Sequence, residues 1–415
     1  MTLHSWSELF RVFGRIGLYS FGGPAAQIAL MHRELVDERK WLSEETFLRA
    51  LSLCMLLPGP EAMQLATYAG WRLRGVGGGL LAGLLFVIPG AAVILALALC
   101  YAAWGSVPLV QAAFLGIKSA VVVIVLEALL RVARRALKTR MAWVLAGLAF
   151  VALFVFGLPF PLIVLCAGVI GAAAATGTPD PVDTGSVSLA RSLPVLALWG
   201  GLWLAPLALL WALDSAFLLQ IGLFFSKLAV VTFGGAYAVL AYMAQTVVAD
   251  HGWISTDQMI DALGLAETTP GPLILVTEFV ALLAGHIEGG IGLALAAGAL
   301  SLWVTFIPCF LWIFLAGPYL DAIARRPRLS GALDAITAAV VGVILNLALW
   351  FAMHVLFEKL AQAPGLALTV PRLESLDWRA GLLTLLAAVL LLRLHRGIGF
   401  TLTVMALGGL AASFV

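Results

Sequence analysis

The chain has 415 residues, of which 62% are hydrophobic and only 11% are charged. A soluble domain carries about 25% charged residues, whereas several apolar runs here exceed the ~20 residues that a bilayer-spanning helix needs. The composition therefore excludes a soluble globular protein and predicts an all-α polytopic membrane protein whose surroundings are the lipid bilayer. The net charge of +2 gives no reason to expect nucleic acid as a partner.

About thirteen apolar elements follow one another along the chain, and the polar stretch from Ala175 to Leu189 divides them. We expect an N-terminal repeat over 1–175, a linker and connecting transmembrane helix over 176–214, and a C-terminal repeat over 215–415. The elements span approximately residues 8–31, 46–70, 77–103, 107–132, 141–157, 159–175, 193–213, 216–249, 258–285, 289–316, 331–357, 378–393 and 397–414.

One stretch of the chain occurs twice. A shift of 212 positions places Phe233-Gly234-Gly235 on Phe21-Gly22-Gly23 and Pro270-Gly271-Pro272 on Pro58-Gly59-Pro60, without a gap. Glycine and proline inside apolar runs interrupt a helix, because proline removes a donor and glycine loosens the backbone. Duplicated broken helices are the best sequence-level indication of a transporter binding site.

The repeat continues at a shift of 219 after seven inserted residues near 286–292, so elements one to four match elements eight to eleven. Equivalent elements of the two copies are seven elements apart, and this odd offset predicts that the copies enter the membrane from opposite sides, as an inverted repeat. Apart from Arg11, Arg15, Lys118 and Lys227, the chain has 20 Lys and Arg residues, and 17 of them fall on one side if the four broken elements are re-entrant. By the positive-inside rule, this favours a cytoplasmic N-terminus and nine full crossings.

Basic residues lie inside the broken elements of both copies. Arg15 precedes Ser20 by five residues, and the shift of 212 places Lys227 on Arg15 and Thr232 on Ser20. Placing a cation in the bilayer costs about 2.5–3.5 kcal/mol on insertion scales. A basic residue at the same place in both repeats therefore suggests a function. The alternative is that both side chains extend to the membrane interface. Next to opened backbone amides and helix N-termini, two cations suit a dianion.

The breaks and turns add hydrogen-bonding groups to these cations. A Pro-Gly-Pro triplet cannot continue a regular helix, and re-entrant segments satisfy the freed backbone by lining a protein cavity; an ordinary loop between two helices is the alternative. The expected anion site consists of Arg15, Ser20, Phe21, Gly22, Gly23, Pro58, Gly59, Pro60, Gln64, Lys227, Thr232, Phe233, Gly234, Gly235, Thr269, Pro270, Gly271 and Pro272.

Three carboxyl groups lie in the apolar runs near the turns: Glu61, Glu267 and Glu278. Carboxyl groups in apolar surroundings titrate closer to neutral pH, so these three are candidates for coupling anion movement to protons. Lys118 and Glu127 lie within the element 107–132, where they either line a pathway or belong to a structural polar network.

The sequence contains no P-loop, no HExxH, no GxSxG and no paired Cys and His cluster. We therefore expect no enzyme activity, no metal site and no cofactor. A passive anion channel remains an alternative to a transporter, because a channel can use the same amides and cations. A homodimer is the general expectation for a transporter of this kind.

Taken together, the motifs resemble the chromate transporter family in its long, two-domain form. The resemblance rests on Phe21-Gly22-Gly23-Pro24, Arg39-Lys40-Trp41-Leu42 and Leu57-Pro58-Gly59-Pro60, with a second copy from Thr232 to Pro272, and it covers essentially the whole chain. It implies a bacterial inner-membrane exporter of chromate, a sulfate analogue, that uses an ion gradient and confers chromate resistance. The second copy departs from the first, since Ala236 replaces Pro24 and Leu273 stands opposite Glu61. The residues themselves do not distinguish chromate from sulfate or another oxyanion.

Overall fold

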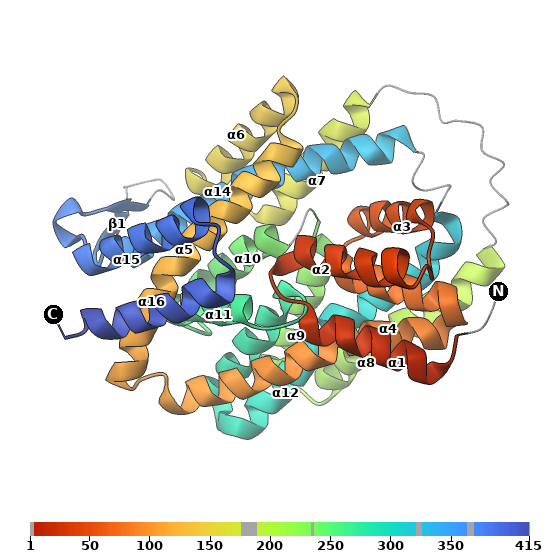
Figure 1. Ribbon diagram of the computed structural model, residues 1–415, viewed down its shortest axis with the longest axis horizontal. Helices are drawn as coiled ribbons and strands as arrows, with labels where there is room; N and C mark the ends of the chain where they lie inside the picture. Colours follow the sequence, from red (N-terminus) through yellow and green to blue (C-terminus); the bar gives the residue numbers. More distant parts are fainter. Residues whose placement is uncertain (1–3, 176–188, 234–235, 321–325, 363–368, 415) are drawn as a thin grey trace. The chain divides into compact units, whose positions relative to one another are not determined.

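The computed structural model describes residues 4–175, 189–233, 236–320, 326–362 and 369–414 (Figure 1). Almost all of them are helical, which confirms the expected all-α membrane fold. The first half contains α1 (Trp6–Tyr19), α2 (Gly23–His32), η1 (Arg33–Glu38), α3 (Glu44–Leu56), α4 (Glu61–Trp104), α5 (Pro108–Ala136), α6 (Arg140–Phe154) and α7 (Phe160–Ala174). The remainder contains α8 (Leu189–Ala212), α9 (Ala216–Val231), α10 (Ala236–Gln245), η2 (Thr246–Asp250), α11 (Thr256–Thr268), η3 (Leu273–Leu275), α12 (Val276–Ala316), η4 (Gly317–Tyr319), α14 (Pro327–Leu356), β1 (Leu360–Gln362), β2 (Thr369–Pro371), η5 (Leu373–Ser375), α15 (Trp378–Ala388), η6 (Val389–Arg393) and α16 (Ile398–Ala412).

The two halves repeat the same order of elements around their breaks. In the first half, α1 and α2 are followed by the π-helical turn η1, by α3, by a Pro-Gly-Pro turn and by the long helix α4. In the second half, α9 and α10 are followed by the π-helical turn η2, by α11, by a Pro-Gly-Pro turn and by α12. The helices end at the predicted Phe-Gly-Gly and Pro-Gly-Pro motifs. Proline lacks the amide that a helix needs, and glycine favours other backbone conformations.

Each long helix that follows a turn doubles back on itself. In α4 the bend lies at Arg74 and Gly75, and in α12 it lies at Gly289 and Gly290. Gly75 and Gly290 have φ values of 63° and 76°, in the left-handed region that glycine enters without steric cost. The bends separate the predicted elements 46–70 from 77–103 and 258–285 from 289–316, as the sequence indicated.

The two arms of each bent helix lie against one another through small residues. A Cβ atom at Gly70 would collide with the carbonyl oxygen of Gly78, and one at Gly298 would meet the side chain of Leu282 at 2.6 Å. Small residues let helix backbones approach closely, which is how helices associate in membranes. The short arm before each bend is therefore packed on the long arm after it.

The chain forms two compact units, and each unit takes segments from both sequence repeats. Unit 1 comprises residues 1–99, 175–236 and 269–330, and unit 2 comprises residues 100–174, 237–268 and 331–415. All residues of the expected anion site belong to unit 1, whereas Lys118, Glu127 and Glu267 belong to unit 2. The polar linker expected after Ala175 lies outside the described residues.

Aromatic side chains from the second half fill the interior of unit 1. Phe310 and Phe314 on α12 pack against glycines of α4, at Gly83 and Gly79. Trp199 on α8 lies with its ring centroid 5.6 Å from Phe310 and 5.2 Å from Phe314. Side chains of this size contribute much of the buried apolar area of a core, so the two repeats are stabilised by each other.

In unit 2, α5 packs on α15 and α16 around a shared apolar cluster. Gly116 on α5 touches the backbone at Met405 on α16, and Gly409 on α16 touches the backbone at Ala112 on α5. The segment between α14 and α15, expected to be a loop, contains the short antiparallel pair β1 and β2, with Ala361 opposite Val370. Asp377 ends this segment by accepting hydrogen bonds from the first amides of α15.

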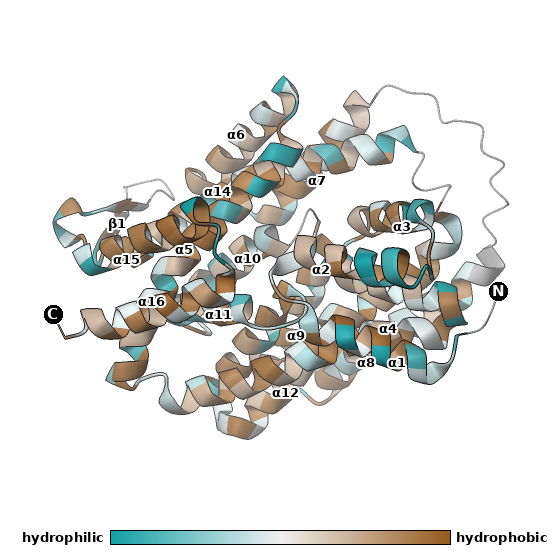
Figure 2. Cartoon of the chain, viewed as in Figure 1, coloured by the Kyte–Doolittle hydropathy of each residue, from teal (hydrophilic) through white to brown (hydrophobic). Residues whose placement is uncertain are grey.

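Most helices are hydrophobic along their whole length (Figure 2). Five described helical segments are long and apolar enough to cross a membrane. These are 61–104, 108–136, 192–212, 273–319 and 327–356, and shorter apolar helices accompany them. The helices that would make the nine expected crossings are the long arms of α4 and α12 together with α5, α6, α7, α8, α14, α15 and α16.

Cysteine labelling tests the expected threading. In a variant whose four cysteines are replaced by alanine, we expect Glu38→Cys and Arg72→Cys to react with an impermeant reagent from the cytoplasm, and Asp250→Cys from outside. All three positions are exposed. The measurement is labelling in intact cells compared with everted vesicles. If the probes at 38 and 72 react from opposite faces, α3 and the first arm of α4 cross the membrane and are not re-entrant.

Candidate functional site

Within unit 1, each Pro-Gly-Pro turn is hydrogen-bonded to the helix break of the other repeat. The amide of Gly59 donates to the carbonyl oxygen of Thr232 at 2.9 Å, and the amide of Gly271 donates to that of Ser20 at 2.8 Å. These two bonds are equivalent under the shift of 212. They bring together two breaks and two turns that are far apart in the chain.

The turns depend on glycine for their shape. Gly59 has a φ of 117° and Gly271 a φ of 89°, values that residues with a Cβ atom rarely adopt. The space around each glycine is also occupied: a Cβ atom at Gly59 would lie 2.9 Å from Nε2 of Gln64 and 3.0 Å from Sγ of Cys309. Glycine at these two positions is therefore required both by backbone conformation and by packing.

Two buried glutamines support the turns. Gln27, on α2, donates from Nε2 to the carbonyl oxygen of Gly271 at 2.6 Å and to that of Ser20 at 3.3 Å. Gln64, on α4, donates from Nε2 to the carbonyl oxygen of Pro58 at 2.7 Å. The Oε1 atoms of both side chains have no hydrogen-bond donor among the described residues. Gln64 was expected in the site, whereas Gln27 was missed, because its partner lies in the other half of the chain.

The hydroxyl groups at the two breaks make equivalent bonds. Ser20 donates to the carbonyl oxygen of Ile16 at 2.6 Å, and Thr232 donates to that of Leu228 at 2.6 Å. Each bond closes the last turn of the helix before the break. The hydroxyls thus stabilise the helix ends, and each uses its one hydrogen atom in doing so.

This geometry differs from the sequence-based expectation in one respect. The amides of Gly59 and Gly271 were expected to be available to an anion, but each is bound to a carbonyl oxygen of the other repeat. The reason is that a buried amide must have a partner, and the facing break supplies one. At the first break, the N-terminal amides of α2, which begins directly after Gly22, lack partners within their helix.

Arg15 is paired with a carboxylate that the sequence did not indicate. Its Nε lies 3.4 Å from Oε1 of Glu34, a residue of η1 whose side chain is completely buried. Glu34 also forms an ion pair with Arg39. Arg39 also lies 3.5 Å from Oε2 of Glu38, so the charges of the two arginines and the two glutamates balance. The Arg15 side chain is 52% exposed, so part of its guanidinium remains accessible.

Lys227, the equivalent of Arg15, lies on α9 and is exposed. Neither cation is buried with the two turns. Phe21 is 48% exposed, and its amide donates to the carbonyl oxygen of Tyr19, as that of Phe233 does to Val231. Gly234 and Gly235 lie outside the described residues.

The three coupling candidates occupy different surroundings. Glu61 is the first residue of α4, directly after Pro60. Glu278 lies in the first turn of α12, is 3% exposed, and its Oε2 has no donor among the described residues. Glu267 belongs to unit 2 and accepts a hydrogen bond of 2.7 Å from the hydroxyl of Tyr237.

In unit 2 the two pathway candidates have separate partners. Glu127 pairs with Arg131 one turn later on α5, at 2.6 Å. Lys118 reaches α11, where its Nζ lies 2.8 Å from Asp257 and 3.5 Å from Asp261. The two aspartates were not singled out in the sequence, although their spacing of four residues places them on one face of a helix.

Comparison with known proteins places the chain in a family. The family profile described as "Chromate transporter" matches residues 7–172 and 219–413. The chromate transport protein of Pseudomonas aeruginosa is 33% identical over 350 residues, covering 82% of this chain and 79% of that protein. The chromate transport protein of Cupriavidus metallidurans is 29% identical over 339 residues, covering 81% and 80%. A probable chromate transport protein of Synechococcus elongatus is 30% identical over 344 residues, covering 82% and 83%.

No solved structure matches the chain. The family profile matches both halves, on either side of the linker and connecting helix, and the matched segments contain both breaks and both turns. The chain therefore belongs to the chromate transporter family.

Proposed function

We propose that the protein is a secondary active transporter that exports chromate across the bacterial inner membrane, with its N-terminus in the cytoplasm, and so confers chromate resistance. The similarity to chromate transport proteins supports the substrate. The observation that carries the site is the pair of reciprocal hydrogen bonds, Gly59 to Thr232 and Gly271 to Ser20. They join the broken helices of both repeats in one place, as a transporter with a single central site requires.

The substrate would bind beside these breaks. A tetrahedral dianion needs several donors and positive charge, and helix N-termini supply both. The N-terminal amides of α2 are one source, and Arg15 and Lys227 are the basic side chains of the two broken elements. We infer that the residues of the expected anion site act together, with the turn amides of Gly59 and Gly271 serving the fold while they remain bound to carbonyl groups.

The same site suggests how transport could be coupled to protons. Glu61 and Glu278 each lie in the first turn of a helix that follows a Pro-Gly-Pro turn, so their negative charge competes with an anion for the same positive helix end. Protonation of either carboxyl group would remove that competition. Coupling to protons, coupling to the membrane potential and transport as an antiporter all belong to this proposal, as does a homodimeric assembly.

Uptake of radiolabelled chromate into everted membrane vesicles tests this function. We expect saturable accumulation that disappears when either the pH gradient or the membrane potential is collapsed, and competition by sulfate if the site accepts oxyanions in general. Saturable uptake that ignores both gradients would instead identify a facilitator. Uptake that does not saturate and ignores both gradients would identify a passive anion channel, and accumulation of sulfate without chromate would identify a sulfate transporter.

A further inference from the structure

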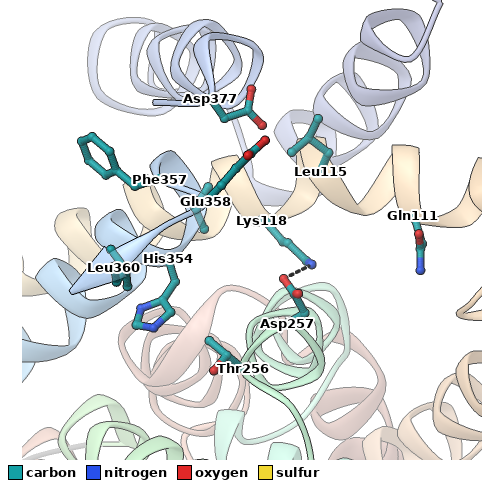
Figure 3. A pocket seen from close by; sticks show the side chains of 11 residues that line it. Gln111, Leu115, Lys118, Thr256, Asp257, His354, Phe357, Glu358, Leu360 and Asp377 are labelled. Atoms are coloured by element: carbon teal, nitrogen blue, oxygen red, sulfur yellow. Dashed lines mark hydrogen bonds and ion pairs between the residues drawn. The ribbon is translucent and has the colours of Figure 1, made fainter. Parts of the chain in front are cut away.

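Unit 2 contains a cavity of about 570 Å³ that the proposed oxyanion site does not use. It is bordered by α5, by the start of α11, by the end of α14 and by the segment before α15 (Figure 3). Its titratable lining groups are Lys118, Asp257, His354, Glu358 and Asp377. Three carboxyl groups and one ammonium group line it, so the cavity attracts cations and repels anions.

Lys118, which lines the cavity, also contacts a buried carboxylate outside it. Asp257 has a side chain that is 77% exposed, and Lys118 extends from α5 towards it (Figure 3). On the other side, Nζ of Lys118 lies 3.5 Å from Oδ1 of Asp261, whose side chain is only 6% exposed. Lys118 therefore bridges a carboxylate in contact with water and one that is nearly enclosed.

The charges of this group do not balance. Asp257 and Asp261 carry two negative charges and Lys118 one positive charge, which leaves one uncompensated negative charge next to a buried position. Buried charges without a partner are costly in a membrane protein. One proton bound by the group makes it neutral, and Asp261, as the less hydrated carboxylate, benefits most from binding it.

The hydrogen bonds around Asp261 indicate which oxygen would take the proton. The hydroxyl of Tyr101 donates to Oδ2 at 2.7 Å, whereas Oδ1 has no hydrogen-bond donor among the described residues. A proton on Oδ1 conflicts with no other donor except Lys118 at 3.5 Å. Lys118 can then remain with Asp257 at 2.8 Å, so protonation of Asp261 leaves that ion pair in place.

Unlike the breaks and turns, the group formed by Lys118, Asp257 and Asp261 is not repeated at the equivalent positions of the first half. The shift of 212 places Asp257 and Asp261 on Glu45 and Arg49, which pair with one another one turn apart on α3. The charges of Glu45 and Arg49 cancel, so this pair does not need to bind a proton to become neutral. The second half thus has a titratable group where the first half has a closed ion pair.

Helix α11 connects this group to the second turn. Asp261 lies about two turns before the helix ends at Thr268, and the Pro-Gly-Pro turn around Gly271 follows directly in the chain. Along the chain, this turn is therefore the nearest part of the proposed oxyanion site to Asp261.

We propose that Asp261, held between Lys118 and Tyr101, is a proton-binding site that couples proton movement to oxyanion transport through α11. This inference rests on the proposed transport function for its coupling, but not for the binding of the proton. Asp261 is contacted by Lys118 and Tyr101, and Asp257 lies one turn earlier on the same helix. The cavity that Lys118 and Asp257 line is also lined by the titratable groups of His354, Glu358 and Asp377.

Infrared difference spectroscopy on the full-length protein in lipid tests proton binding directly. Between acidic and neutral pH, the wild type should show carbonyl bands of protonated carboxyl groups, and Asp261→Asn should lack the band that belongs to Asp261. The exposed Asp250→Asn is the matched control and should keep the band. In Lys118→Met the band should persist to higher pH, because the cation that favours the ionised form is gone. A band unchanged in both Asp261→Asn and Lys118→Met would overturn the site.

Coupling is then measured in liposomes that contain a pH-sensitive dye. Chromate-driven pH change should occur in the wild type and in Asp250→Asn and be lost in Asp261→Asn, while tracer exchange of chromate at equal pH is retained. Proton movement that persists in Asp261→Asn would refute the coupling role. Absence of tracer exchange in the wild type would refute the proposed chromate transport instead, and the infrared bands would still decide whether Asp261 binds a proton.

Discussion

Alanine in place of Gly271 or Gly59 is expected to reduce chromate transport at least about tenfold, with the protein still inserted in the membrane. Both glycines have φ values that alanine adopts only with strain, at a cost of about 1–3 kcal/mol, and about 1.4 kcal/mol corresponds to a factor of ten. Relief of the strain would move the amides that bind Thr232 and Ser20. The measurement is initial uptake into everted vesicles, normalised to the amount of protein in the membrane.

Gly14→Ala is the matched control for these variants. Gly14 lies within α1, and a Cβ atom added there would meet nothing within 4 Å. Since alanine is a better helix former than glycine by about 1 kcal/mol, this variant should be at least as stable and transport normally. Wild-type uptake by both Gly59→Ala and Gly271→Ala would contradict the proposed role of the turns, and loss in only one of them would assign the site to one repeat.

Removal of either repeated cation is expected to give the second large effect. Arg15→Ala and Lys227→Ala should each weaken chromate transport about tenfold or more, because a hydrogen bond to a charged group contributes about 1.5–3 kcal/mol. Arg15→Lys should retain part of the activity, since it keeps the charge but not the guanidinium geometry. The dependence of initial uptake on chromate concentration separates weaker binding from slower turnover.

Arg11→Ala is the control for the basic residues. Arg11 is exposed and lies one turn before Arg15 on α1, but leucine stands opposite it in the second repeat. Its removal should leave uptake near the wild-type level. Wild-type affinity in both Arg15→Ala and Lys227→Ala would show that these side chains only reach the membrane interface.

The pairing of Arg15 with Glu34 could not be predicted from the sequence. The sequence identified Arg15 by its repetition as Lys227, but it gave no sign that the carboxylate of Glu34 would be completely buried beside it. Glu34 lies in the segment from Arg33 to Lys40, whose many charged residues are typical of an exposed loop. Its burial follows from the π-helical turn η1, which no local pattern predicted.

Lys118 gives a second example. It was recognised as a polar residue in an apolar helix, yet its partners, Asp257 and Asp261, lie on α11, far away in the chain. The spacing of the aspartates predicts that they share a face of a helix, but not which helix that face contacts. The cavity that Lys118 and Asp257 border requires four separate segments to meet.

The sequence by itself determined the properties that depend on local chemistry. Hydropathy identified the membrane helices, and the conformational limits of glycine and proline located the breaks, the turns and their duplication. Only the tertiary structure decided that each turn binds the break of the other repeat, through Gly59 with Thr232 and Gly271 with Ser20. It also decided that each compact unit is built from both repeats. The physical reason is that any buried amide needs a partner, but every carbonyl group of the chain is chemically the same, so the choice of partner depends on how the whole chain packs.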